Sequence, residues 1–114
     1  MVPKEHRLSD RHEISHAFRS GKKAYGSLFS FVFLPNALPI SRFAVIVSKK
    51  IFPRAVDRNR TKRLMRESLR HLLPHIAPGY DGIVTIVKKP IDKLAFKDVS
   101  VEVEALLRQS RLLL

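Results

Sequence analysis

The hydrophobic and polar positions of the chain divide it into three strand-like stretches and three helical ones. Residues 25–34, 42–48 and 83–88 are rich in aromatic and β-branched side chains, which is typical of strands. Apolar residues at helical spacing predict helices over about 10–20, 56–73 and 96–111. The last helix has a single apolar face made of Val99, Val103, Leu106 and Leu107. A further short strand is possible near residues 22–27.

Turn-forming and capping residues set the limits of these elements. Ser9 or Asp10 can cap the first helix, Gly21 can end it, and Pro74 ends the long central helix. Between the strands, we expect one turn at Pro35, Asn36 and Pro39 and one loop at Pro78, Gly79, Asp81 and Gly82. The strand over 42–48 is expected to run antiparallel to the strand over 25–34. The resulting order, α-β-β-(β)-α-β-α, predicts one α+β domain over residues 1–114, with helices packed on a sheet.

The strong positive charge of the chain indicates a domain that binds a polyanion. The 114 residues include 22 Lys and Arg against 10 Asp and Glu, a net charge of +12. Nucleic acid is the favoured partner for so basic a small domain, ahead of an anionic membrane surface. The absence of cysteine excludes a disulfide scaffold, a cysteine-ligated zinc site and a thiol nucleophile. Neither a signal peptide nor a membrane-spanning run is evident.

The positive charge is concentrated on the helix over residues 56–73. At about 100° per residue, an arc of roughly 140° holds Arg58, Asn59, Lys62, Arg63, Arg66 and Arg70. The opposite arc holds Thr61, Leu64, Met65, Ser68 and Leu72, which are suited to packing on a core. Like charges at i,i+4 repel one another, and we expect a bound partner rather than acidic neighbours to compensate them. Lys49, Lys50 and Arg54 extend the patch, while Arg60 lies outside the arc near Glu67.

Residues with catalytic chemistry are scattered rather than grouped. The acidic residues form no Asp-x-Asp or similar set that could hold Mg²⁺. His12 and His16 stand at i,i+4 on the first helix, where contact with solvent or RNA is favoured over metal binding or acid–base chemistry. Pro74 breaks the helical spacing of His71 and His75. We therefore expect neither a catalytic residue nor a metal site in the protein.

The segment VSKKIFPRAVDRNRTKRLMRE resembles the signature of the bacterial ribonuclease P protein subunit. The resemblance extends over about residues 6–112 and rests on the spacing of Lys-Lys, Arg-Asn-Arg, Lys-Arg and Arg-Glu. It implies a two-layer, ribosomal-protein-like α-β sandwich in which the basic helix forms part of a left-handed βαβ crossover. It also implies an auxiliary subunit of a cytoplasmic endoribonuclease whose RNA removes the 5′ leader of precursor tRNA with Mg²⁺.

The resemblance also assigns two RNA-binding regions. The catalytic RNA would contact Lys49, Lys50, Arg54, Arg58, Asn59, Arg60, Lys62, Arg63, Arg66 and Arg70. The leader would lie in a cleft between the first helix and the sheet, lined by Ile14, Phe18, Val32, Lys88 and Lys89. Because Ile14 and Val32 are aliphatic, contact with ribose and phosphate is favoured over base stacking.

Two questions stay open at this point. Phe29, Phe31 and Phe33 share the other face of their strand, where core packing is favoured over RNA stacking. A structural RNA-binding protein of the ribosomal type is the alternative function, because composition does not separate the two classes. The sequence leaves the oligomeric state undetermined.

Overall fold

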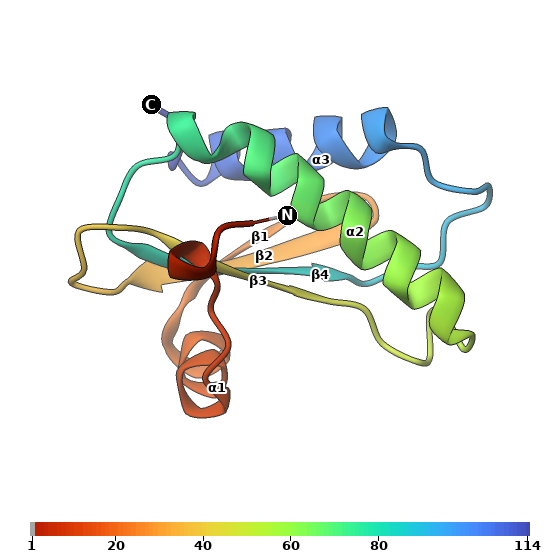
Figure 1. Cartoon of the computed structure of the whole chain (residues 1–114), viewed down its shortest axis with the longest axis horizontal. Helices are drawn as coiled ribbons and strands as arrows, with labels where there is room; N and C mark the ends of the chain where they lie inside the picture. The colour runs from red at the N-terminus through yellow and green to blue at the C-terminus, as the bar shows by residue number, and fades with distance from the viewer. Residues whose placement is uncertain (1) are drawn as a thin grey trace.

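A computed structural model describes residues 2–114 and shows a four-stranded sheet with helices on both faces (Figure 1). The helices are α1 (Arg11–Ser20), α2 (Ala55–Leu72) and α3 (Phe96–Gln109), with two short 3₁₀ turns, η1 (Lys4–His6) and η2 (Leu73–His75). The strands are β1 (Lys22–Tyr25), β2 (Phe29–Pro35), β3 (Arg42–Ile46) and β4 (Tyr80–Ile86). The α+β class is confirmed, and β1 is the additional short strand.

The strands are ordered β1-β2-β4-β3 across the sheet. Strand β2 pairs antiparallel with both β1 and β4, whereas β3 pairs parallel with β4. The direction predicted for β3 relative to β2 is therefore confirmed, but β4 lies between the two strands. The β3–α2–β4 segment is a parallel βαβ crossover that contains the basic helix. Its left hand stays a prediction.

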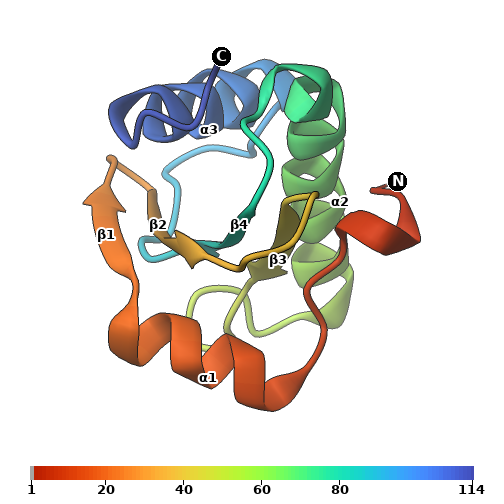
Figure 2. The same cartoon turned by 90° about the vertical axis from the view of Figure 1, so that its left-hand side faces the viewer.

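The two faces of the sheet carry separate apolar clusters. Helices α2 and α3 cover one face, where Phe31, Met65 and Val103 belong to the main core (Figures 1 and 2). Helix α1 packs against β2 and β4 on the opposite face. A smaller cluster there is centred on Ala17 and Ile83. Alternation along the strands thus sends successive side chains into different layers of the sandwich.

The phenylalanines of β2 pack in the main core, as predicted. Phe29 and Phe31 are fully buried, and Phe33 is partly buried against the same cluster. The rings of Phe31 and Phe33 stack with centroids 5.4 Å apart, and Tyr80 meets Phe33 edge-on at 6.4 Å. These side chains stabilise the sandwich from the side that faces α2 and α3.

The predicted helix limits are confirmed to within the usual one or two residues. The Asp10 carboxylate caps α1 by accepting from the backbone N–H groups of His12 and Glu13, at 2.8 and 3.0 Å. These bonds hold the pKa of Asp10 below its usual range, mainly through the Glu13 N–H. Gly21 ends α1, and Pro74 falls in the 3₁₀ turn just after α2.

The limits of three strands were predicted wrongly. The stretch over 25–34 is split, because Gly26 turns the chain and donates to the Phe29 carbonyl at 2.8 Å. The Glu102 carboxylate of α3 fixes this turn by accepting from the N–H groups of Leu28 and Phe29. Such a contact across 73 residues cannot be read from local sequence.

The second error concerns the start of β4. Asp81 and Gly82 were predicted to lie in a loop, yet both pair within the sheet. Gly82 is required because a Cβ there would come within 2.7–2.9 Å of the Phe31 and Phe43 rings. Asp81 is buried because Arg42 and Asn36 satisfy its carboxylate. The third error is the end of the predicted strand over 42–48, which stops at Ile46.

Candidate RNA interface

Helix α2 presents a cationic face whose centre differs from the predicted one. Asn59, Arg63, Arg66 and Arg70 are exposed, while Arg58 and Lys62 are only half-exposed. The cause is Leu69, which is 1% exposed and falls between Arg58 and Lys62 at 100° per residue. The buried side also holds Thr61, Met65, Ser68 and Leu72, as predicted. The solvent-facing surface is therefore centred near Arg63.

The two arginines of the Arg58-Asn59-Arg60 triplet each hold a neighbouring loop by hydrogen bonds to its backbone. Arg58 Nη1 donates to the carbonyls of Phe52 and Pro53, at 2.9 and 2.7 Å. Arg60 Nη2 donates to the Leu94 carbonyl at 2.6 Å. Asn59 lies exposed between them. Both arginines therefore have a structural role, since each donates to backbone carbonyl oxygen in a neighbouring loop.

Part of the positive charge on α2 is compensated within the helix, contrary to the expectation of a partner alone. Glu67 accepts from Arg70 at 2.9 and 3.0 Å, one turn along the helix. The hydrogen bonds from Arg70 are the largest cause of the lowering of the Glu67 pKa to about 2. Arg54 lies 3.4 Å from Asp57 at the other end. Arg63 and Arg66 are the exposed arginines in the middle of the face.

The basic loop before α2 is anchored by its apolar residues. Ile51 and Phe52 pack against the main core, and the Phe52 N–H donates to the Ser48 carbonyl at 3.1 Å. Lys49 and Lys50 are exposed in the turn. The loop therefore presents its charges from a fixed backbone beside the first turn of α2.

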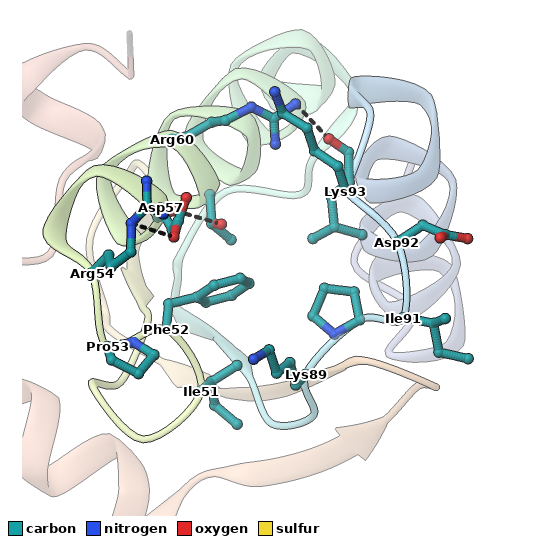
Figure 3. A pocket seen from close by; sticks show the side chains of 13 residues that line it. Ile51, Phe52, Pro53, Arg54, Asp57, Arg60, Lys89, Ile91, Asp92 and Lys93 are labelled. Carbon is teal, nitrogen blue, oxygen red and sulfur yellow. Dashed lines mark hydrogen bonds and ion pairs between the residues drawn. The ribbon is translucent and has the colours of Figure 1, made fainter.

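A pocket of about 650 Å³ opens between this loop, α2 and the segment that follows β4 (Figure 3). Its charged lining residues are Arg54, Asp57, Arg60, Lys89, Asp92 and Lys93. Lys89, which was predicted to bind the leader, therefore faces the same pocket as Arg54 and Arg60. Lys88 instead lines a neighbouring groove with Lys97.

Three of the five residues predicted for the leader cleft lie on the α1 side of the sheet, with unequal exposure. Phe18 is 37% exposed, Ile14 is half-buried, and Val32 is only 4% exposed. Gly21 covers Val32, since a Cβ at Gly21 would lie 2.8 Å from a Val32 methyl group. Lys88 and Lys89 follow the far end of β4, away from the α1 contacts at Ile83.

Arg42 ties α1 to the sheet. Its guanidinium donates to both carboxylate oxygens of Asp81 at 2.9 and 2.8 Å, and to Glu13 of α1 at 2.7 Å. These two carboxylates, Asp81 first, raise the pKa of Arg42 above its ordinary value. Asn36 completes the cluster by donating to Asp81 at 2.9 Å. The arrangement fixes the position of α1 over β4.

Three residues that the sequence did not single out join these surfaces. They are Arg42, Phe52 in the pocket, and Tyr25, which is 67% exposed on the same side of β1 as Lys23. Alternation along residues 22–25 could have placed Tyr25 opposite the buried Ala24. The positions of Arg42 and Phe52 depend on distant segments.

The structure groups few residues with catalytic or metal-binding chemistry. Within residues 2–114, no three His, Cys, Asp or Glu side chains come together as a metal site. His12 and His16 are exposed on α1 beside Arg42. His71 meets the Phe96 ring edge-on at 5.5 Å. Across the same residues, no helix has the length and apolarity needed to span a bilayer.

Comparison with known sequences places the chain in a family. The family model described as Ribonuclease P matches residues 2–111. The chain is 39% identical over 89 residues to the ribonuclease P protein component of Microcystis aeruginosa, covering 75% of this chain and 74% of that protein. It is 36% identical over 110 residues to the corresponding component of Exiguobacterium, covering 96% and 94%.

Solved structures of ribonuclease P proteins have the same fold as this chain. The RNase P protein from Thermotoga maritima aligns with a TM-score of 0.82 and 29% identity, covering 90% of this chain and 96% of that one. The Staphylococcus aureus RNase P protein aligns with a TM-score of 0.84 over 96% and 98%, at 23% identity. The α+β sandwich therefore matches the fold of solved ribonuclease P proteins.

Proposed function

The chain belongs to the ribonuclease P protein family. From that premise, we propose which of its surfaces bind each RNA of the holoenzyme. The protein is the auxiliary subunit of an endoribonuclease that processes the 5′ end of tRNA. The exposed face of α2 and the loop over residues 49–54 bind the catalytic RNA. The α1 side of the sheet receives the 5′ leader of the precursor tRNA. Family membership favours this function over a ribosomal-type structural role.

The observation that carries the proposal is a cationic face on a helix whose other side is immobilised in the core. Met65 and Leu69 are almost fully buried, so α2 is held in place before any partner binds. Arg63 and Arg66 project from the opposite side. Guanidinium groups bind phosphate oxygens bidentately, and rigid placement reduces the entropy lost on binding.

The basic residues fall into two proposed roles. Direct contact with the catalytic RNA is assigned to the exposed or half-exposed set of Lys49, Lys50, Arg54, Asn59, Lys62, Arg63, Arg66 and Arg70. Arg58 and Arg60 act mainly by holding the loops on either side of α2, because each already donates to backbone carbonyls. Both retain further N–H groups that can reach phosphate.

On the α1 side, Phe18 and Ile14 contact the leader, and Val32 forms the buried floor beneath them. With only one aromatic among the three, the contacts are mainly to ribose and phosphate. Tyr25, which is exposed on the adjacent strand, offers a second stacking surface. Lys88 supplies positive charge for the leader where β4 ends, whereas Lys89 faces the pocket beside the first turns of α2. Hydrolysis is carried out by the RNA with its Mg²⁺, in the cytoplasm.

The test is reconstitution. Purified protein is added to its cognate catalytic RNA at low Mg²⁺, together with a precursor tRNA that carries a 5′ leader. Faster release of the leader is the expected result, and the gain should shrink when the leader is shortened. If the protein leaves 5′ maturation unchanged, the proposed function is wrong.

A further inference from the structure

We propose that the pocket between residues 51–54, the first turns of α2 and residues 89–94 holds one unpaired nucleotide of the catalytic RNA. This inference rests on the proposed function and adds a specific subsite to it. The pocket lies beside the cationic face of α2 rather than on it. It is built by three segments that are distant in sequence (Figure 3).

The charge of the pocket suits a phosphodiester strand. Its lining holds four cations, Arg54, Arg60, Lys89 and Lys93, against two acids, Asp57 and Asp92. Arg54 lies 3.4 Å from Asp57, which neutralises one of these cations in part. Arg60 gives one N–H to Leu94 and retains others for a ligand. Cations on opposite walls can each meet one of the two phosphates that flank a nucleotide.

The floor of the pocket suits a base. Phe52 projects into the hollow from the loop before α2, and Ile51, Pro90 and Leu94 supply apolar surface around it (Figure 3). A volume of about 650 Å³ lies within the range of roughly 300–1,000 Å³ that is typical of small-molecule pockets. Only an unpaired base can enter, because a base within a duplex is stacked and paired. Aromatic side chains commonly stack on such bases in RNA loops.

The position of the pocket favours the catalytic RNA over the leader. Phe52 and Leu94 pack against the main core, on the side of the sheet that α2 covers. The leader is assigned to the other side, where α1 packs around Ile83. A strand that runs along the exposed face of α2 reaches Arg60 and Lys93 directly.

Substitutions test the two halves of the subsite separately. Phe52→Leu keeps an apolar side chain but removes the ring, and affinity for the catalytic RNA should fall by about fivefold to a hundredfold. Lys89→Ala with Lys93→Ala should lower the slope of log affinity against log salt by about 1.4, at about 0.7 per phosphate of an unpaired strand. The charge-matched control is Lys22→Ala with Arg108→Ala, on β1 and α3. Affinity and slope equal to the control in both variants would overturn the proposal.

Cross-linking identifies the nucleotide itself. Because the chain has no cysteine, Asp92→Cys can carry a short photo-cross-linker as a unique label, with Ala105→Cys as the matched control on α3. In holoenzyme assembled with precursor tRNA, the Asp92→Cys label should reach an unpaired nucleotide of the catalytic RNA. Cross-links to the leader, to a duplex segment or to neither RNA would overturn the proposal. Wild-type stimulation of 5′ maturation in the same preparation shows that the proposed function stands independently of that outcome.

Discussion

Removing the Arg42 side chain tests whether α1 is fixed by the Arg42–Asp81–Glu13 cluster. Arg42→Met keeps the apolar stem and deletes the guanidinium, which leaves the Asp81 carboxylate buried at 8% side-chain exposure. Asp81 would then keep the hydrogen bond from Asn36 at 2.9 Å. Removal of one member of a buried ion pair is strongly destabilising, because the remaining charge is uncompensated.

The expected loss in the free energy of unfolding differs between the Arg42–Asp81 pair and the Arg42–Glu13 pair. Breaking a buried pair costs about 3–5 kcal/mol, and because the Asn36 contact is retained, we expect Arg42→Met to cost about 3 kcal/mol. Glu13 is 45% exposed in its pair with Arg42, so Glu13→Gln should cost less than about 1 kcal/mol. At about 4 °C per kcal/mol for a domain of this size, Arg42→Met should lower the Tm by about 12 °C.

Urea and thermal unfolding of both variants provide the assay. If Arg42→Met is destabilising because the buried Asp81 carboxylate loses its ion-pair partner, adding Asp81→Asn should restore part of the lost stability. A loss for Arg42→Met no larger than that for Glu13→Gln would refute the reasoning. So would an Arg42→Met, Asp81→Asn double variant less stable than Arg42→Met alone.

Three further outcomes are expected. Gly82→Ala should destabilise the protein by about 1–3 kcal/mol, because its methyl group would overlap the Phe31 and Phe43 rings, and a wild-type Tm would contradict that packing. Phe33→Leu should lower the free energy of unfolding by about 1 kcal/mol without weakening RNA affinity, since the ring packs in the core; an affinity loss alone would contradict this. Because Arg70 is the largest cause of the low folded-state pKa of Glu67, the stabilisation that the Glu67 carboxylate provides is present above about pH 4 and is lost as pH falls toward 2. Glu67→Gln should therefore flatten the pH dependence of unfolding in that window, and an unaltered profile would show that the pair does not persist in solution.

The sequence predicted best those features that depend on local pattern. Asp10, Gly21 and Pro74 set helix limits through capping and backbone geometry that act within a few residues. The apolar face of α3 followed from helical spacing alone. The basic side of α2 was predicted for the same reason, although Leu69 shifts its centre away from Arg58.

The features that it missed depend on distant partners. Asp81 and Gly82 have the composition of a turn, but they lie in β4. Arg42 neutralises the buried Asp81 carboxylate, and the Phe31 and Phe43 rings leave no room for a Cβ at position 82. The carbonyls that Arg58 and Arg60 bind belong to loops whose paths are set by the whole fold. The position of β4 between β2 and β3 likewise depends on the β3–α2–β4 crossover, and no local sequence pattern predicts it.

The salt dependence of binding to the catalytic RNA tests the central claim, that the exposed face of α2 contacts RNA phosphates. The comparison is between the wild-type protein, Arg63→Ala with Arg66→Ala, and the charge-matched Lys22→Ala with Arg108→Ala. If both arginines contact phosphates, the slope of log affinity against log salt should fall by about 1.4–1.8 for the α2 variant, and the control should match the wild type. A slope for the α2 variant equal to that of the wild type would contradict the account.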